Sequence, residues 1–510
     1  MARYKPHDRN PMLLPVVLSE QIVPGSFAFA LDYLVDHELD LSKMDERFKN
    51  DEVGASAYDP RVMLKIVLLG YSQGLISSRA IERACIGNVQ FIALSGDSQP
   101  SHAHIAKFVS SMGEQIKPLF SQVLMTCDAQ GLIGRELFAI DGVKLPSNAS
   151  KERSGTFEEL HHRAERLDKA AAQIIERHQA QDKQAAEQPL QARRQARIDA
   201  LRQEAQRTRE FLARSSKRLN RKGQELKTNV SDPDSAKMAT SKGVIQGYAA
   251  QAAVDSAHQV IVAVDVIGSG SEQTMLLPLV EQCGRLRHEH TVITADAGYH
   301  SDDNVKALAE QGVPAMIADN QMRKRDERLA DQGKHRAKDE PLYDKRPTQS
   351  PQERPVKLFR PSDFSFNDDH TCTCPAGKQL LSTGAIYSVG KGLRREDFKA
   401  QAQDCAGCSL RSQCLRHPRR TAARKVVRFH PRQIDPNDPS HRMRQAIDSP
   451  RGRALYSQRI GTVEPVFANI RYNKRLSRFN LRGHAKVNTQ WHLYCMVHNI
   501  EKLARSGWRT

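Results

Sequence analysis

The sequence predicts an α/β protein in which a mixed-sheet core carries an N-terminal helical domain and two insertions. Strand-like and helix-like patterns alternate over residues 229–320, as they do in a mixed sheet covered by helices. Apolar residues spaced alternately by three and four mark two helical arms before that segment. Five of the nine cysteines fall between Cys372 and Cys414, which marks a second insertion. The expected domains are residues 1–135, 136–150 with 229–320, 151–228, 321–440 and 441–510.

The charge of the chain indicates a polyanionic partner. The 510 residues carry a net charge of +18 at pH 7, and the hydrophobic share of 39% excludes wholesale disorder. Such a surplus favours nucleic acid or a membrane surface as partner, although a merely soluble basic protein stays an alternative. No stretch reaches the ~18 apolar residues of a spanning helix, and the N-terminus lacks the apolar region of a secretory signal. We therefore expect a cytoplasmic protein that binds no membrane, with cysteines as thiols or metal ligands.

The first 135 residues are typical of short helices separated by tight turns. Asp59 followed by Pro60 predicts a helix start. Further short helices are expected at residues 77–85, 89–94 and 101–108. This pattern suits a DNA-binding domain of the helix-turn-helix kind, and it suits any small helical bundle equally well.

Two of the core strands are expected to end at an acidic residue. A buried strand over residues 136–140 would end at Asp141, and a later strand over residues 291–295 would end at Asp296. The other expected core elements are strands at 247–255, 259–267 and 313–318 and helices at 274–286 and 302–311.

The first insertion has the pattern of a helical hairpin. Its arms run over residues 157–174 and 198–219, and Pro189 lies between them, where the hairpin would turn. Residues 191–230 hold twelve Lys and Arg against four acids. We expect an antiparallel coiled-coil finger with a basic second arm; a solvated helical spacer without a partner is the alternative.

Three carboxylates stand out by their position. Asp141 and Asp296 end core strands, and Glu464 is the only carboxylate between Ser449 and Ile500, a strongly basic stretch. Two Mg²⁺ or Mn²⁺ ions ~3.5–4 Å apart catalyse phosphodiester displacement, and such hard ions prefer carboxylate oxygens. Carboxylates from neighbouring strand ends and a packed helix suit such a pair of ions.

Each acid also has a purely structural interpretation. These interpretations are a plain turn at Asp141, an Asx turn at Asp296 that caps the next helix, and an ion pair of Glu464 with Arg459 or Arg471. Two other strand-end acids, Asp255 and Asp265, compete for the same role.

Four segments, taken in order, resemble the DDE transposases of bacterial insertion sequences, in the branch related to the IS-four and IS-five superfamilies. They are Phe138-Ala-Ile-Asp141-Gly-Val-Lys-Leu, Gly247-Tyr-Ala-Ala-Gln-Ala-Ala-Val-Asp255, Thr294-Ala-Asp296-Ala-Gly-Tyr299, and Tyr456-Ser-Gln-Arg459 running into Val463-Glu464-Pro-Val-Phe-Ala-Asn-Ile-Arg471. The resemblance implies a ribonuclease H-like core. It also implies that Asp141, Asp296 and Glu464 are catalytic residues that hold two Mg²⁺ or Mn²⁺ ions.

The last segment resembles the Tyr-Arg-Glu-Lys signature of that family, with departures. Four residues separate Arg459 from Glu464 where three are usual, and Arg471 stands where the lysine would be. Pro465, directly after the glutamate, implies a kink or a helix restart. The residues expected to bind DNA near the cut are Tyr456, Arg459, Arg471, Lys474 and Arg475.

The activity that the resemblance implies is transposition. Such an enzyme binds the terminal inverted repeats of an insertion sequence, cleaves the double-stranded DNA ends and joins their 3′-hydroxyls to target DNA by two-metal phosphoryl transfer. We then expect a homodimer in a synaptic complex, associated with the bacterial nucleoid. The alternatives are a metal-dependent nuclease without strand transfer and a catalytically decayed DNA-binding protein.

The cysteine cluster favours a structural zinc site. Cys405 and Cys408 have the spacing of a zinc knuckle, and Cys414 and Cys374 complete four thiol ligands, with Cys372 as a possible substitute. Cys374 opens a Cys-Pro-Ala-Gly element that resembles one of the family. Unligated thiols, or a redox pair at Cys405 and Cys408, are the alternatives. Residues 411–430 hold seven Lys and Arg and no acid, which favours phosphate contacts.

Overall fold

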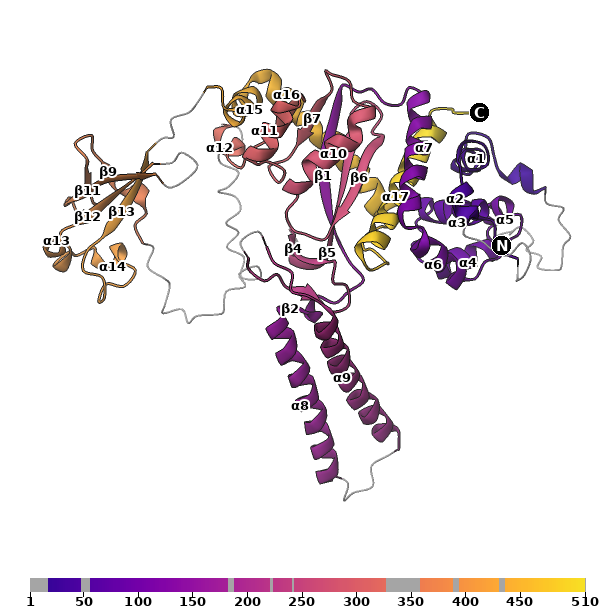
Figure 1. The fold of residues 1–510 in the computed structure, drawn as a ribbon, viewed down its shortest axis with the longest axis horizontal. Coiled ribbons are helices and arrows are strands. Elements are labelled where there is room, and N and C mark those ends of the chain that lie inside the picture. The colour runs from indigo at the N-terminus through magenta and orange to yellow at the C-terminus, as the bar shows by residue number, and fades with distance from the viewer. Residues whose placement is uncertain are drawn as a thin grey trace, which may run out of the picture. The chain divides into compact units, whose positions relative to one another are not determined.

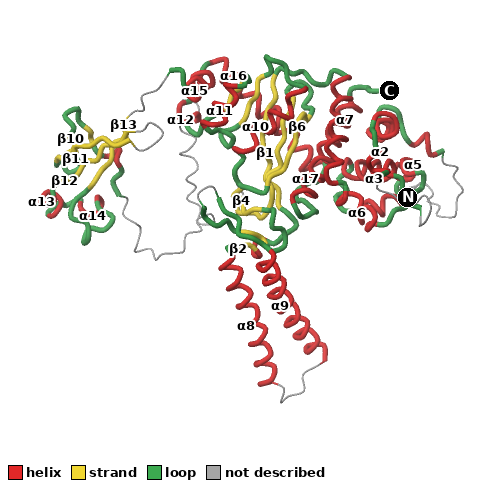
Figure 2. Tube along the Cα trace, viewed as in Figure 1, coloured by secondary structure: helices red, strands yellow, loops and turns green. Residues whose placement is uncertain are grey.

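The protein is a mixed α/β chain with a helical N-terminal region and mixed sheets, as the sequence predicts at this level (Figures 1 and 2). The computed structural model describes residues 17–46, 56–181, 188–220, 223–240, 243–326, 358–388, 394–430 and 436–509. The chain divides into two compact units. Unit 1 is Met1–Met322 with Met443–Thr510, and unit 2 is Arg323–Arg442.

The N-terminal region of unit 1 is built from short helices. They are α1 (Phe27–Tyr33), a π-helix (Leu34–Glu38), α2 (Ser42–Asp45), α3 (Pro60–Ser72), α4 (Ser78–Gly87), α5 (Val89–Ser95), α6 (His102–Ser111) and α7 (Ile116–Ala129). The predicted start of α3 is confirmed, because the Asp59 side chain accepts a hydrogen bond from the Arg61 amide at 2.7 Å and Pro60 is the first helical residue.

A six-stranded mixed sheet forms the centre of unit 1. Its strands are β1 (Leu137–Pro146), β4 (Ala236–Thr240), β5 (Gly243–Asp255), β6 (Ile261–Ile267), β7 (Val292–Ala295) and β8 (Ala315–Ile317). The order is β4-β5-β1-β7-β8, with β6 also paired to β5. Strands β1, β7 and β8 run parallel to one another, whereas the pairings of β5 with β1, β4 and β6 are antiparallel.

The sheet corrects two expectations. Strand β1 does not end at Asp141 but continues to Pro146, because residues 142–146 go on pairing with β5. The predicted helix over 274–286 is three short pieces: a 3₁₀ turn (Gln273–Met275), α10 (Leu276–Gln282) and a second 3₁₀ turn (Cys283–Arg285). Strand β4 had no counterpart among the predicted elements.

The remaining helices of unit 1 pack around this sheet. They are α11 (Asp302–Glu310), α16 (Pro450–Ala468), a π-helix (Asn469–Asn473) and α17 (His484–Arg505), while α12 (Met322–Arg325) and α15 (Pro439–Asp448) cross the boundaries between the units. Ser449 caps α16 by accepting from the Gly452 amide at 3.0 Å. Helix α16 runs through Pro465 without a break, so the predicted restart there is wrong.

Helix α17 is the central helix of unit 1. Every residue from Val487 to Ile500 is buried, and the helix packs against α3, α7 and β6. Its buried polar groups are hydrogen-bonded to the sheet: the Trp491 indole donates to the Gln251 carbonyl at 2.9 Å. The Asn499 side-chain amide accepts a hydrogen bond from the Ile261 N–H and donates one to the Ile261 carbonyl. These hydrogen bonds fix the position of α17 on the sheet, and α17 in turn packs against the N-terminal helices α3 and α7.

A helical hairpin leaves the sheet between β1 and β4 (Figure 1). It consists of β2 (Ser154–Gly155), α8 (Phe157–Gln181), α9 (Gln188–Arg214) and β3 (Thr228–Asn229), and β2 pairs with β3 at its root. Helix α9 begins at Gln188, so Pro189 lies in its first turn, which tolerates proline, and not in the connection as predicted. The helix ends at Arg214, short of the predicted end at Leu219.

Unit 2 is a five-stranded antiparallel sheet with two short helices. Its strands are β9 (Ser365–Phe366), β10 (Thr371–Thr373), β11 (Gln379–Ser388), β12 (Arg394–Ala400) and β13 (Lys425–His430), in the order β13-β12-β11-β10-β9. The helices are α13 (Ala402–Ala406) and α14 (Arg411–Cys414). The domain boundaries and the coiled-coil packing of the hairpin stay predictions. Among the described helices of both units, none is long and apolar enough to cross a membrane.

The buried His498 makes the stability of unit 1 sensitive to acid. Its Nε2 donates to the Gln259 carbonyl at 2.8 Å and its Nδ1 accepts from the Asn469 amide at 3.1 Å, so the neutral imidazole is fully satisfied. Burial lowers the pKa of His498 from 6.5 to about 4. The unfolded chain thus binds this proton more tightly, and stability falls as the pH drops from about 6.5 towards 4.

We expect this single group to cost on the order of 3 kcal/mol at the acid end of that window. Thermal unfolding at pH 7 and pH 5 checks the prediction. His498→Gln should lower the melting temperature at pH 7 but reduce its further fall between pH 7 and pH 5. Substitution of the exposed His290 by Gln should leave that fall as large as in the wild type. A fall in melting temperature between pH 7 and pH 5 that is as large in His498→Gln as in the wild type would contradict the prediction.

Candidate active site

Parallel pairing of β1 with β7 brings Asp141 and Asp296 to neighbouring positions. Ile140 lies opposite Ala295 in the register, and the two aspartates are the next residue of each strand or of the loop after it. Because parallel strands present the same end at one edge of a sheet, the chain places both carboxylates together. They are close enough for the charge of Asp296 to raise the pKa of Asp141.

Asp141 is buried and paired with Arg459. Arg459 Nη1 lies 2.5 Å from Asp141 Oδ2, and the two side chains are 11% and 16% exposed. Burial raises the pKa of Asp141, and the opposing effect of the Arg459 charge does not fully offset it. Its Oδ1 accepts from the Gly142 amide at 2.8 Å. A plain turn at Asp141 is excluded, because the residue lies within β1.

Asp296 begins a tight turn, in agreement with the first part of the alternative that it forms an Asx turn capping the next helix. Its Oδ1 accepts from the Gly298 amide at 2.8 Å. The next helix, α11, is instead capped by Ser301, which accepts from the Asn304 amide, so Asp296 does not serve as that cap. One oxygen of Asp296 is engaged by the turn, which holds the carboxylate in place beside β1.

A third acid, Glu272, lies beside these two aspartates. A Cβ atom at position 298 would lie 2.9 Å from Glu272 Oε2 and 2.9 Å from Asp296 Oδ1. Burial raises the pKa of Glu272 to about 7; Lys144 opposes this shift, and the charges of Asp296 and Asp141 add to it. Glu272 is not among the residues predicted from the sequence, because it ends no strand and follows a Gly-Ser loop after β6.

Tyr456 and Arg459 approach the aspartates from α16. They are three residues apart, so both lie on the same face of the helix, and the guanidinium of Arg459 lies 5.7 Å from the centre of the Tyr456 ring. Burial raises the pKa of the Tyr456 hydroxyl. These two residues of the predicted signature are thus brought to Asp141 and Asp296.

The structure does not bring Glu464 to the same place. Glu464 follows Arg459 by five residues, which turns it by roughly 140° around the helix, and its side chain is exposed. Val463, four residues after Arg459, lies where the usual spacing would put the glutamate, and it is fully buried. The structure shows no ion pair of Glu464 with Arg459 or Arg471 among the described residues.

The other predicted DNA-binding residues lie around the π-helix and the turn after it. Arg471 stacks over the exposed Tyr472 at 5.6 Å. Lys474 is buried and its ammonium pairs with Glu501. Arg475 has a positive φ of 58° and packs its side chain near Gly74. Their contacts with DNA stay predictions.

The competing strand-end acids have structural roles. Asp255 is fully buried and accepts from the amides of Arg135, Ala257 and His258, which fixes the turn between β5 and β6. Asp265 lies within β6 and accepts from the Val266 amide at 2.7 Å.

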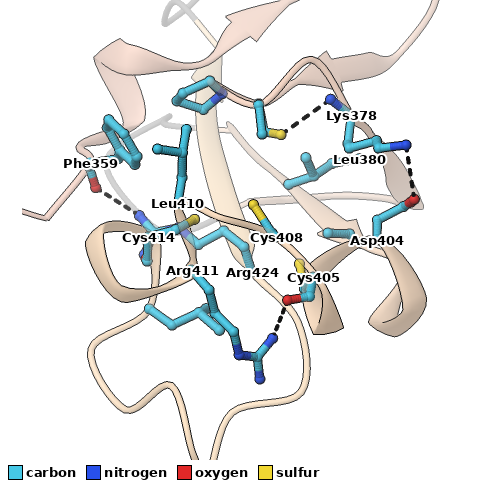
Figure 3. A pocket seen from close by; sticks show the side chains of 15 residues that line it. Phe359, Lys378, Leu380, Asp404, Cys405, Cys408, Leu410, Arg411, Cys414 and Arg424 are labelled. Carbon is cyan, nitrogen blue, oxygen red and sulfur yellow. Dashed lines mark hydrogen bonds and ion pairs between the residues drawn. The ribbon is translucent and has the colours of Figure 1, made fainter.

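In unit 2, four cysteines line one small cavity of about 30 Å³: Cys374, Cys405, Cys408 and Cys414. Figure 3 shows the sulfur atoms of the last three turned towards this space. Burial raises the pKa of the Cys414 thiol, Arg424 opposes this, and the other three thiols add to it. Cys372 lies outside this lining, fully buried in β10, and burial raises its pKa to about 11.

Neither site forms a ready coordination sphere. Among the residues that the structure describes, no group of three or more His, Cys, Asp or Glu side chains is close enough to hold a metal ion. The donor types nevertheless fit: carboxylates suit hard divalent cations and clustered thiols suit zinc. At the acidic site, the guanidinium of Arg459 occupies one oxygen of Asp141.

Two family models match parts of the chain, and both describe transposases. Residues 373–504 match the transposase DDE domain, and residues 16–111 match a transposase domain, DUF772. The first match includes Tyr456, Arg459 and Glu464, whereas Asp141 and Asp296 lie outside both. No curated protein matches the chain. The matches support a DDE transposase, and with it a DNA substrate and the use of divalent metal ions in general.

Proposed function

We propose that this protein is a DNA transposase that cleaves the ends of an insertion sequence and joins them to target DNA. The observation that carries the proposal is the neighbouring position of Asp141 and Asp296, directly after the parallel pairing of Ile140 with Ala295. Arg459 of α16 forms an ion pair with Asp141, and Tyr456 lies beside Arg459. One of the two family matches adds a transposase DDE domain over residues 373–504, which include α16. A ribonuclease H-like core, and membership of the IS-four or IS-five branch, belong to this proposal.

Asp141 and Asp296 would hold the divalent ions, Mg²⁺ or Mn²⁺. When bound, these ions activate the attacking oxygen and stabilise the leaving oxygen of the phosphodiester. Binding requires that the Arg459 guanidinium leave Asp141, since that ion pair now occupies the carboxylate. A DNA phosphate is the natural alternative partner for Arg459, because guanidinium groups pair with phosphate as readily as with carboxylate.

The other predicted residues have matching roles in the proposal. Tyr456 and Arg459 would hold the phosphate backbone near the cut, with Arg471, Lys474 and Arg475 further along the DNA. Glu464 is the third catalytic acid that the resemblance implies; Glu464→Gln tests it. The N-terminal helices would read the terminal repeat, and the basic hairpin arm would add contacts that do not depend on sequence. The synaptic homodimer stays part of the proposal.

A strand-transfer assay separates the proposed enzyme from a nuclease. The full chain is incubated with Mg²⁺ and duplex oligonucleotides of the element ends, supplied precut with a free 3′-hydroxyl, and with supercoiled target DNA. We expect covalently joined products that require the 3′-hydroxyl and disappear in Asp296→Asn. Cleavage without joined products would favour the nuclease. DNA binding without either reaction would favour a decayed binding protein.

The four cysteines of unit 2 would hold a structural zinc ion. The soft thiols around one small cavity are the donor set that tetrahedral zinc prefers. We expect metal analysis of the purified chain to find about one zinc per chain. Cys405→Ser should lose the metal and lower the melting temperature, while Cys372→Ser should keep the metal. A zinc-free wild-type chain would contradict this prediction.

A further inference from the structure

A cavity of about 530 Å³ lies between the turn that joins β5 to β6 and the C-terminal end of α17. Three basic side chains line it, His258 of the turn and Lys502 and Arg505 of the helix. The other lining residues are Leu132, Ser256, Ala257, Gln259 and Ser506. The lining that the structure describes thus includes no acid. A cavity of this size takes a ligand of several atoms, and its charge favours an anion.

The Lys502 ammonium lies at this cavity without a carboxylate partner. It donates to Gln259 Oε1 at 3.3 Å, and neither Lys502 nor Arg505 forms an ion pair with an acid that the structure describes. Burial lowers the pKa of Lys502, and the neighbouring charge of Arg505 adds to that shift. Glu501 opposes the shift, but its carboxylate pairs with Lys474. Two cations thus lie close together at a partly buried position.

The end of α17 explains only part of this arrangement. The C-terminal end of a helix attracts cations, which favours Lys502 and Arg505 in the last turn. That attraction does not require the two charges to meet in one cavity, where burial and mutual repulsion both cost free energy. An anion bound between the two side chains would offset both costs, since charge-assisted hydrogen bonds to an anion are the strong ones.

Gln259 connects the cavity to α16, the helix that carries Arg459. Pro465 lacks an N–H, so the carbonyl of Gly461, four residues earlier, loses its usual donor within the helix. Gln259 Nε2 donates to that carbonyl at 3.2 Å, while Gln259 Oε1 accepts from Lys502. One side chain therefore satisfies α16 at its proline and positions the Lys502 ammonium. Because Gly461 follows Arg459 by two residues, this contact fixes the cavity relative to the candidate active site.

The turn that lines the cavity is also joined to the strand that carries Asp141. The Ser256 amide donates to the carbonyl of Leu137, the first residue of β1, at 3.0 Å. Asp141 follows Leu137 by four residues, which span ~13 Å in a strand. Successive phosphates of one DNA strand are ~3.4 Å apart along the helix axis, so this distance corresponds to about four base pairs.

From these observations we propose that the cavity between the β5–β6 turn and α17 binds a backbone phosphate of the DNA beside the cleaved bond. Lys502 and Arg505 would hold the phosphate, with His258 at its edge. This inference rests on the DNA substrate of the proposed function. It adds a phosphate site outside the hairpin arm, the cysteine module and the residues that follow α16, which are the DNA contacts expected from the sequence.

The first test compares DNA binding by the full chain and by the double variant Lys502→Gln/Arg505→Gln, using fluorescence anisotropy with duplex element ends. We expect the double variant to bind roughly tenfold more weakly, and the salt dependence of its affinity to be lower by about one phosphate contact. The matched control is Lys117→Gln/Lys306→Gln, which removes the same charge from exposed positions on α7 and α11 and should bind like wild type.

A second test locates the phosphate on the DNA. Element ends are prepared with one uncharged methylphosphonate linkage at successive positions. We expect the affinity of the wild type to fall at a position roughly four base pairs from the cleaved bond. The double variant should be insensitive to the change at that position, because the contact is already lost. An equal loss of affinity there in both proteins would overturn the inference.

Failure of the inference and failure of the proposed function give different results. Wild-type DNA affinity in Lys502→Gln/Arg505→Gln, with cleavage still lost in Asp141→Asn, overturns only the inference. Equal weakening in the control pair also overturns it, since net charge alone would then explain the loss. A position-specific phosphate contact in a wild type that neither cleaves nor joins DNA would keep the inference and remove the proposed function.

Two further measurements complete the test. Inorganic phosphate that raises the melting temperature of the wild type but not of the double variant, while DNA binding is equal in both, would assign the cavity to a free anion and overturn the inference. If the double variant does not fold, Arg505→Gln decides, because Arg505 is exposed. Weaker DNA binding by that folded variant supports the inference, and unchanged binding refutes it.

Discussion

Asp141→Ala is expected to abolish DNA cleavage while leaving DNA binding in place. The substitution removes the central carboxylate of the site, and loss of such a group from a phosphoryl-transfer centre costs at least ~10³-fold in rate. DNA affinity should change little, because it comes from many separate Lys and Arg contacts with phosphate. Cleavage of labelled element ends and a parallel mobility-shift titration measure both quantities. Cleavage that persists in this variant would show that the two-aspartate site is wrong.

Stability must be followed in the same variant, because Asp141 also neutralises Arg459. Without its partner the guanidinium, whose Nε already lacks a hydrogen-bond partner among the described residues, is left buried and uncompensated. We expect a loss on the order of 1–3 kcal/mol. Asp141→Asn keeps an acceptor for Arg459 and should be milder in stability but equally inactive. Asp265→Asn is the control, since Asp265 competed for the same role in the sequence but lies within β6, where it accepts from the Val266 amide.

The paired aspartates were predictable from the sequence because the rule behind them is local. A short apolar run that reaches an acid identifies a strand and its edge, and parallel pairing then sets the two acids side by side. The prediction erred on Asp141 as a strand end, since pairing with β5 continues to Pro146. The error did not matter for the site, because the register with β7 ends at Ile140 and Ala295.

Glu272 was not predictable from its own surroundings. It follows β6 by five residues in a loop, and what brings it to Asp296 is the return of the chain through α10 to β7. That proximity depends on tertiary packing and leaves no periodic signal. The sequence does hold one indirect signal about Glu464. The extra residue between Arg459 and Glu464 moves the glutamate off the helix face that Arg459 occupies.

Gly298→Ala is expected to inactivate the enzyme without unfolding it. The new methyl group would lie 2.9 Å from the carboxylate oxygens of both Asp296 and Glu272, closer than van der Waals contact allows. The clash is with the ends of side chains and not with backbone, and residue 298 is exposed, so the fold can yield by moving the two acids apart. A displacement of about 1 Å at a reacting centre costs ~10²-fold in rate. We therefore expect cleavage to fall by about that factor, Mn²⁺ binding to weaken, and the melting temperature to change little.

Gly284→Ala is the matched control for that variant, because a Cβ at position 284 meets no atom within 4 Å. It should cleave DNA like wild type, which excludes a general effect of adding a methyl group near the core. If Gly298→Ala cleaves DNA slowly, single-turnover cleavage at saturating Mg²⁺ distinguishes two causes of the lower rate. Recovery at high Mg²⁺ means that the methyl group weakens cation binding, whereas a rate that stays low means that the acids are misplaced around a bound cation. Wild-type cleavage and Mn²⁺ affinity in Gly298→Ala would mean that the space between Asp296 and Glu272 is not used in the reaction.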